Sequence, residues 1–254
     1  MRIIEAIILG IVQGITEWLP ISSSGHLVLL QNLFKIEQPV VFDLILHLGS
    51  LLVVLIVFRE DIKKLVIGVF RKEKEYINLL FKIIIATIPI ALVGFLLKDF
   101  IEKIFNDLRV VGFSFLFTSI LLFLSKYPKV KNKELNYKNS FIIGLVQVLA
   151  LLPGLSRSGS TISAGLMQGV KNEDVARFSF LLFIPAILGA TILEIKNVNL
   201  INDVIPLVIG VLTVVIVGFI SLKLLLYIVK NSKIYFFSYY CLIIGLITLG
   251  IYYL

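Results

Sequence analysis

The sequence predicts an all-α integral membrane protein with six transmembrane helices and two re-entrant helical hairpins in an inverted-topology repeat. Three observations predict this fold class: an apolar composition, a duplicated and interrupted apolar segment, and an uneven distribution of basic residues. The chain of 254 residues is 59% hydrophobic and 16% charged, with a mean hydropathy of +1.03. Soluble domains are nearer half apolar and about a quarter charged, so these values favour a membrane protein.

Six apolar stretches are long enough, or nearly so, to cross a bilayer. A spanning helix needs roughly 17–25 mostly apolar residues, and flanking Lys and Arg side chains can snorkel to the interface of a shorter one. We predict spans near residues 41–58, 79–97, 109–125, 177–195, 204–222 and 235–254. The first span contains Asp43 and His47, which must face protein rather than lipid. For His47 we expect an interhelical hydrogen bond.

Two further apolar segments are broken by Ser and Gly, at Pro20–His26 and Pro153–Thr161. An offset of 134 positions aligns them with seven identities in eighteen positions. A broken segment repeated in both halves of a membrane protein indicates a polar site near the bilayer midplane. We therefore predict a single membrane domain, 1–254, with repeat one at about 1–125, repeat two at about 138–254 and a linker at about 126–137. The identical residues are Ile8, Gly10, Val12, Gln13, Ser22, Ser24 and Gly25, matched by Ile142, Gly144, Val146, Gln147, Ser156, Ser158 and Gly159.

The basic residues predict the topology. With the broken segments as hairpins that do not cross, 17 Lys and Arg residues fall on one side and six on the other. The side richer in basic residues is cytoplasmic, which places both termini outside. Three spans separate the hairpins, and an odd number makes them enter from opposite sides. We expect the polar stretches at 59–78 and 126–139 to be solvated cytoplasmic loops.

The polar residues inside the broken segments are the candidates for chemistry. Gln13 and Glu17 are four apart and share one helix face, which Pro20 should end. A second half-helix then starts at the serine turn, with His26 in its first turn. Helix N-termini bind anions such as phosphate. The second hairpin repeats this arrangement and adds Arg157, whose guanidinium forks onto phosphate oxygens.

These groups are the parts of a phosphoryl-transfer or hydrolysis site: anion binders, a carboxylate, a serine nucleophile and the titratable base His26. A hard cation, Mg²⁺ or Ca²⁺, would fit Glu17 bridging to phosphate. Zinc is excluded as the metal, because two His and one Cys cannot build its usual cluster. The basic residues lie at span ends, so we expect no nucleic-acid partner.

Each candidate also has a structural interpretation. Glu17 and Arg157 could pair only to stabilise the bundle, and His26 could be a hydrogen-bonded core residue. The serines are more often caps or small packing residues than catalysts. Gln13 and Gln147 could join across the repeat interface. For Trp18 packing is favoured over substrate stacking.

Both broken segments resemble the motifs of the undecaprenyl-diphosphate phosphatase (bacitracin-resistance) family. The first motif is carried by Gln13–His26 and the second by Leu152–Thr161. The chain length, the duplicated hairpins and Phe178–Leu182 fit as well. The family pattern admits Glu or Gln at position 13, and the Gln here means one fewer anionic metal ligand.

The resemblance implies a membrane phosphatase that removes the terminal phosphate of undecaprenyl diphosphate and so recycles the lipid carrier for cell-wall polymers. It implies a divalent cation, an active site open to the outer face of the plasma membrane, and bacitracin resistance on overproduction. It makes Glu17 the metal or acid–base carboxylate, Ser23 the nucleophile, His26 the base or a competing nucleophile, and Arg157 the diphosphate clamp. The substrate-binding residues expected are Gln13, Ser22, Ser24, Ser156, Ser158 and Thr161.

From these roles we form the hypothesis that His26 activates Ser23 for attack on the distal phosphorus. The partners expected are a polyprenyl diphosphate lipid and the bilayer, with a homodimer left open. One alternative is an isoprenyl-phosphate flippase or transporter using the same midplane site. Another is the membrane lipid phosphatases whose Ser-Arg motif pairs with a downstream His, but no His follows Arg157.

Overall fold

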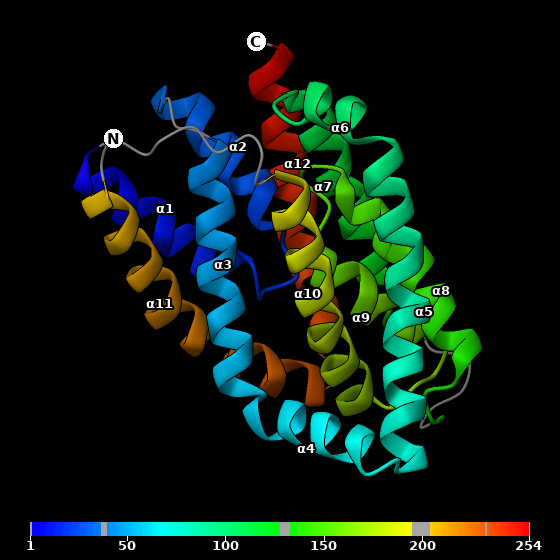
Figure 1. Cartoon of the computed structure of the whole chain (residues 1–254). Coiled ribbons are helices and arrows are strands. Elements are labelled where there is room, and N and C mark those ends of the chain that lie inside the picture. Colours follow the sequence, from blue (N-terminus) through cyan, green and yellow to red (C-terminus); the bar gives the residue numbers. More distant parts are fainter. Residues whose placement is uncertain (1, 37–39, 128–132, 195–203, 232, 254) are drawn as a thin grey trace.

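The structure, a computed structural model, describes residues 2–36, 40–127, 133–194, 204–231 and 233–253. Lys129, Lys131 and Lys196, which entered the predicted charge distribution, lie outside these ranges. Within them the chain is helical (Figure 1), with one isolated bridge between Lys133 and Val170. The helices are α1 (Ile3–Thr16), α2 (Ser23–Phe34), α3 (Val40–Val57), α4 (Arg59–Phe70), α5 (Lys74–Leu96), α6 (Lys98–Ile104), α7 (Leu108–Leu124), α8 (Tyr137–Val148), η1 (Leu149–Leu151), α9 (Arg157–Met167), α10 (Asn172–Glu194), α11 (Val204–Lys230), η3 (Ile234–Phe236) and α12 (Phe237–Tyr253).

The predicted spans coincide with helices. Among the residues that the structure describes, four segments are long and apolar enough to cross a membrane: α5, α10, α11, and η3 with α12. Two bent pairs raise this number to as many as six: α3 with α4, bent by 74°, and α6 with α7, bent by 100°. The prediction of a multi-pass helical membrane protein is therefore confirmed.

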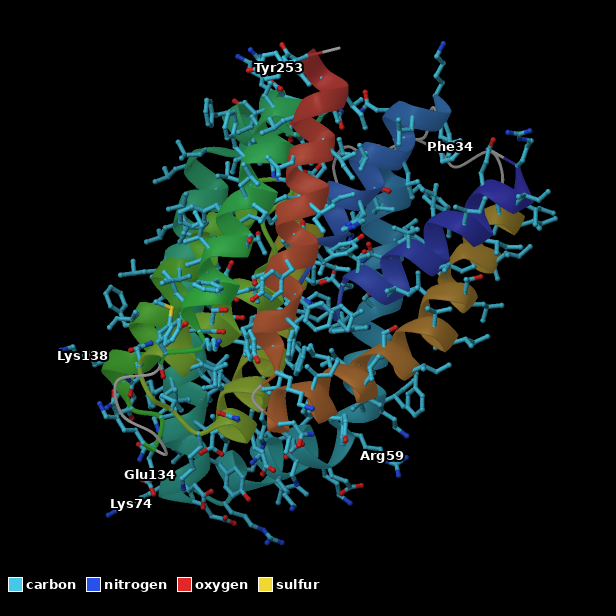
Figure 2. All side chains as sticks on the ribbon, turned by 180° about the vertical axis from the view of Figure 1, so that it is seen from behind. Phe34, Arg59, Lys74, Glu134, Lys138 and Tyr253 are labelled. Carbon is cyan, nitrogen blue, oxygen red and sulfur yellow. The ribbon has the colours of Figure 1, made fainter. Side chains whose placement is uncertain are left out.

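The broken segments form two short hairpins inside this bundle. The first consists of α1 and α2, and the second of α8 and α9 (Figure 1). With 14 residues, α1 is about 21 Å long, less than the roughly 30 Å of a hydrocarbon core. The hairpins enter from opposite directions: in Figure 2, Phe34 at the end of α2 lies in the upper part of the molecule and Lys138 at the start of α8 lies in its lower half.

Each hairpin packs against a long helix through small residues. Helix α1 lies along α11, where a methyl group on Gly10 would sit 2.8 Å from the Gly210 carbonyl oxygen. Helix α8 lies along α5, where a methyl group on Gly144 would overlap the backbone of Ala86. Gly10 and Gly144 are equivalent in the repeat, and small residues let helix backbones approach closely. The repeated sequence therefore produces repeated packing.

The polar stretch 59–78 is largely helical rather than a loop, although most of its residues are exposed as expected. Residues 59–70 form α4, which lies across one end of the bundle (Figure 1). Glu60 and Asp61 in its first turn suit a helix N-terminus, while Ile62 and Leu65 pack against the core. Part of the linker is also held, because the Lys133 N–H donates to the Gly169 carbonyl at 2.9 Å. Helix α4 and the described end of the linker at Lys133 therefore contact the bundle.

The two ends of the bundle agree with the predicted grouping of loops. In Figure 2 the labelled Arg59, Lys74 and Lys138 gather at one end of the molecule, and Tyr253 lies at the other. In Figure 1 the N-terminus, the C-terminus and α6 lie toward the end opposite α4. The segments assigned to one side of the membrane thus share one end of the structure.

Candidate active site

The two hairpins touch at their breaks. A methyl group on Gly25 would lie 2.7 Å from the Cα of Gly154, and one on Gly159 would lie 3.2 Å from Cβ of Pro20. The two contacts are equivalent in the repeat, since the offset of 134 positions matches Pro20 with Gly154 and Gly25 with Gly159. Gly154 also has a φ of +88°, which favours glycine. The repeat therefore brings both helix breaks to one point inside the bundle.

The serine turns cap the helices that leave this point. Ser22 precedes α2 and its hydroxyl accepts the Gly25 N–H at 3.3 Å. Ser156 precedes α9 and accepts the Gly159 N–H at 3.1 Å. Ser158 donates to the Trp18 carbonyl at 3.2 Å, which ties the hairpins together. These hydroxyls act as caps and packing contacts, while their expected role in substrate binding stays a prediction.

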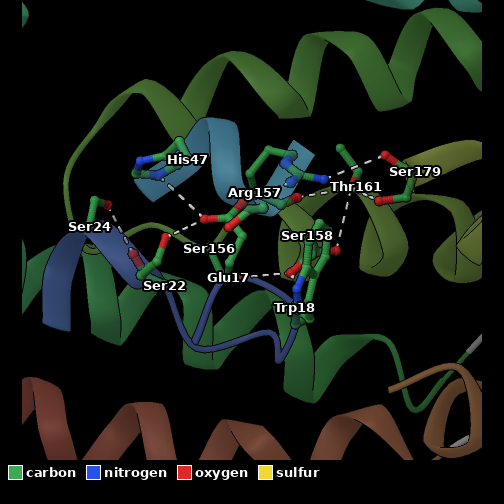
Figure 3. Close-up of polar contacts among 12 residues, drawn as sticks. Glu17, Trp18, Ser22, Ser24, His47, Ser156, Arg157, Ser158, Thr161 and Ser179 are labelled. Atoms are coloured by element: carbon green, nitrogen blue, oxygen red, sulfur yellow. Dashed lines mark hydrogen bonds and ion pairs between the residues drawn. The ribbon is translucent and has the colours of Figure 1, made fainter. Parts of the chain in front are cut away.

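Glu17 is the centre of the polar network between the hairpins (Figure 3). Helix α1 ends at Thr16 rather than at Pro20, because a proline clashes with the carbonyl four residues before it. Glu17 therefore caps α1 and is buried with its oxygens inside the bundle. Its Oε2 accepts the Ser23 hydroxyl at 2.6 Å and the Gln13 amide at 3.1 Å.

The other oxygen of Glu17 binds Arg157. The Nη2 of Arg157 lies 2.9 Å from Oε1, joining residues 140 positions apart (Figure 3). The Arg157 side chain is 12% exposed, and its guanidinium carbon lies 4.2 Å from the ring centroid of Phe183. Its Nη1 also reaches the Ser179 carbonyl at 3.5 Å. A buried charge is tolerated when it is paired and hydrogen-bonded, and the pair satisfies both conditions.

His26 does not meet Ser23. Its Nδ1 lies 2.7 Å from the Ser22 carbonyl oxygen, and its Nε2 lies 2.7 Å from the Tyr240 hydroxyl. Both ring nitrogens are thus occupied, and the Ser23 hydroxyl points to Glu17 instead. Our hypothesis that His26 takes the proton of Ser23 has no contact to support it in the described structure. The carboxylate that lies next to the Ser23 hydroxyl is that of Glu17.

Other expected residues divide between the site and the core. Thr161 shares a 2.6 Å hydrogen bond with Ser179, next to Arg157. Trp18 packs edge-on against Phe180 and Phe183, as the packing interpretation predicted. Gln147 is wholly buried, and neither its amide nitrogen nor its oxygen has a partner among the described residues. The predicted bond between Gln13 and Gln147 is therefore absent from the described contacts.

The structure adds residues that the sequence did not assign to the site. The Nε2 atom of His47, on α3, lies 3.4 Å from Glu17 Oε2. His47 therefore makes the interhelical contact that we expected, and its partner is the central carboxylate of the site. Ser50, one turn further along α3, receives the Gln13 amide at 3.3 Å. Ser179 lies within the motif Phe178–Leu182, which was the available signal for it. Tyr240 lies on α12, and nothing in the sequence indicated that it contacts the site.

The oxygen atoms near Glu17 suit a hard cation. The Gln13 Oε1 atom is buried without a partner among the described residues, next to the Glu17 carboxylate. Magnesium is commonly held by one or two carboxylates together with waters and substrate phosphates. The described residues contain no cluster of three His, Cys, Asp or Glu side chains, so phosphate oxygens would complete such a site. The donors present therefore fit a cation that arrives with a diphosphate.

Comparisons with known proteins agree with this geometry. The model of the family described as bacitracin resistance protein BacA matches residues 6–247. A protein of Halothermothrix orenii named undecaprenyl-diphosphatase is 41% identical over 257 residues, covering 98% of each chain. Undecaprenyl-diphosphatases of Methanosphaera stadtmanae (42% over 269 residues, 98% of each chain) and Korarchaeum cryptofilum (40% over 263 residues, 99% of this chain and 100% of the relative) are similar to it as well. With its two touching hairpins and the buried carboxylate–guanidinium pair between them, the chain belongs to the bacitracin resistance protein BacA family.

Proposed function

We propose that this protein hydrolyses undecaprenyl diphosphate to undecaprenyl phosphate and inorganic phosphate. The observation that carries the proposal is the buried set of Ser23, Glu17 and Arg157, in a chain about 40% identical to proteins named for this activity. The polyprenyl tail requires hydrocarbon, while the diphosphate requires a polar, cationic pocket. Hairpins inside a helix bundle satisfy both, because irregular backbone is tolerated at depth where protein lines it.

The contacts support Ser23 as the nucleophile and Glu17 as its base. The Ser23 hydroxyl gives its proton to Glu17 Oε2, 2.6 Å away, as its oxygen bonds to the distal phosphorus. The bond from that phosphorus to the bridging oxygen breaks, and undecaprenyl phosphate leaves with the oxygen. Water then attacks the phosphoserine, and the bond from phosphorus to the Ser23 oxygen breaks. Ser23 recovers its proton from Glu17, and both protons of the water leave with inorganic phosphate.

Arg157 and the helix ends hold the charge that develops during this transfer. A guanidinium has five N–H donors, so Arg157 can bind phosphate while it remains beside Glu17. The N-termini of α2 and α9 add backbone N–H groups directed at the same point. A divalent cation held by Glu17 and Gln13 Oε1 would neutralise phosphate oxygens when bound. Thr161 and the cap serines would contact the same phosphates.

The basic residues support a proposal for orientation in the plasma membrane. The end that carries Arg59, Lys74 and Lys138 would face the cytoplasm, and both termini would face outward. The first hairpin then enters from outside, and we propose that the active site opens to that face. The alternative of a flippase or transporter has no support from the relatives, whose names describe a phosphatase.

Phosphate release by the purified protein tests the function. The substrates are a C55 and a C15 isoprenyl diphosphate in detergent micelles, assayed with and without a chelator. We expect wild-type turnover, its loss with chelator, and its recovery with Mg²⁺ or Ca²⁺. Ser23→Ala should lower the rate at least about 10³-fold, because it removes the nucleophile. Ser163→Ala is the matched control, a buried hydroxyl without a partner among the described residues. Absence of phosphate release, or full activity of Ser23→Ala, would refute the proposal.

A further inference from the structure

Ser22 adopts a strained backbone conformation beside the nucleophile. Its φ and ψ are 66° and 106°, whereas the equivalent Ser156 has an ordinary extended conformation of −70° and 118°. A residue with a side chain rarely adopts a positive φ, and it does so only where its surroundings hold it there. Ser23 follows directly, so the orientation of the Ser22 peptide determines where the Ser23 hydroxyl points.

His26 binds the carbonyl of this strained residue. Because a carbonyl oxygen only accepts, the proton must lie on Nδ1, which donates to the Ser22 carbonyl at 2.7 Å. The neutral ring then accepts at Nε2, and the Tyr240 hydroxyl donates to it at 2.7 Å. The backbone bond from the His26 N–H to the same carbonyl is long, 3.4 Å. The imidazole therefore replaces a helix hydrogen bond that the conformation of Ser22 weakens.

The second hairpin makes the same contact without an imidazole. Ser160 stands at the position equivalent to His26, and its hydroxyl donates to the Ser156 carbonyl at 2.6 Å. There the backbone bond to that carbonyl is short, 2.9 Å, because Ser156 is unstrained. What the two positions share is a bond to the carbonyl of the helix cap. A serine hydroxyl does this without any titratable group.

We propose that His26 is a positioning residue anchored by Tyr240, and that together they hold the Ser22 peptide so that Ser23 points at Glu17. Tyr240 reaches His26 from α12, 214 residues away, and its ring stacks on the imidazole at 5.7 Å between centroids. The Phe115 ring packs edge-to-face with the imidazole of His26, with 5.1 Å between the ring centroids. Among the described contacts of His26 there is no carboxylate and no cation. This inference rests on the proposed phosphatase activity.

Replacement of His26 by two amides separates positioning from base catalysis. The nitrogen of Asn stands near the place of Nδ1 and can still donate to the Ser22 carbonyl, whereas the nitrogen of Gln stands near Nε2. We expect His26→Ala and His26→Gln to lower kcat about 10²-fold, since small misplacements at a reacting centre have effects of this size. The kcat of His26→Asn should be at least about tenfold higher than that of His26→Ala. The acidic limb of its pH–rate profile should match that of the wild type.

The anchor is tested separately with a pair of neighbouring tyrosines. Tyr240→Phe removes the hydroxyl that binds His26. Tyr239→Phe is the control, because both tyrosines are exposed, at 51% for Tyr239 and 42% for Tyr240, and only Tyr240 contacts His26. We expect Tyr240→Phe to lower kcat about tenfold with KM changed less than about twofold, and to have no further effect in the His26→Asn background. Detergent-solubilised size exclusion checks that each variant is folded.

Two results would overturn the inference. In the first, His26→Asn is as impaired as His26→Ala while both remain folded, which is the behaviour of a lost base. In the second, Tyr240→Phe matches Tyr239→Phe in kcat. Both results presuppose phosphate release by the wild type, so failure of the proposed function is recognised separately, by an inactive wild-type protein.

Discussion

The two hairpins share a scaffold and differ in their chemistry. Both break at the same place, both start their second helix with a capping serine, and both pack against a long helix through a glycine. Yet the offset of 134 positions matches Glu17 with Leu151 and Ser23 with Arg157. The first hairpin supplies the buried carboxylate and the proposed nucleophile, and the second supplies the guanidinium. A pseudo-symmetric frame can therefore hold an asymmetric reaction site when each half keeps only its own reactive group.

The largest effect is expected for the ion pair between Glu17 and Arg157, which joins the two hairpins. Arg157→Met would leave the Glu17 carboxylate buried without its counter-ion, at a cost of about 3–5 kcal/mol in stability. The rate should also fall about 10²–10³-fold, because a phosphate donor is lost. Adding Glu17→Leu, the residue type of the second hairpin, should restore most of the stability and none of the activity.

Thermal unfolding in detergent and phosphate release measure these two effects. An Arg157→Met variant that is as stable as the wild type would show that the buried Glu17 carboxylate does not need Arg157 as its counter-ion. A double variant as unstable as the single one would show that the loss arises from packing.

A smaller effect is expected at His47, whose equivalent is Leu181. The Nδ1 of His47 lies 2.8 Å from the Asp43 carbonyl, so a bond from Nε2 to Glu17 needs a second proton on the ring or on the carboxylate. His47→Leu removes this contact and should lower kcat by about tenfold or slightly more. The control is Leu181→Met. An unchanged kcat for His47→Leu would limit the reaction site to the two hairpins.

The smallest effect is expected at the paired glutamines. Gln13 binds Glu17 and Ser50, whereas the equivalent Gln147 has no partner among the described residues. Gln147→Met should leave phosphate release unchanged and stabilise the protein by about 1 kcal/mol, because a buried unpartnered amide is costly. Gln13→Met should instead lower the activity. Destabilisation by Gln147→Met, seen in thermal unfolding, would indicate that the amide has a partner such as bound water.

The sequence alone predicted the features that depend on local signals. Serine caps, proline breaks and an apolar repeat defined both hairpins, and the motifs paired Glu17 with Arg157. Pro20 was expected to end the first helix, and the structure adds where: Pro20 cannot bond to the carbonyl four residues earlier, so α1 ends at Thr16. Helix α4 was taken for a loop because its apolar positions are interrupted by many charges.

Contacts between distant helices left no such signal. The approach of Tyr240 to His26 depends on how α12 and α2 each pack against α7, which is a matter of tertiary packing. His47 and Ser50 were readable as polar residues in a span, but not as neighbours of Glu17. Hence the hydrogen-bond partner of the Ser23 hydroxyl could not be decided from spacing: His26 is nearer in sequence, and Glu17 accepts the bond in the structure.

The distance in sequence between Glu17 and its counter-ion has a consequence for biosynthesis. The ribosome makes Glu17 140 residues before Arg157, so the nascent first half has an acidic group and no guanidinium to neutralise it. A lone carboxylate is expensive in hydrocarbon. The first hairpin should therefore settle to its final depth only after the second has been synthesised and inserted, which makes the closing of the two halves a late step of membrane integration.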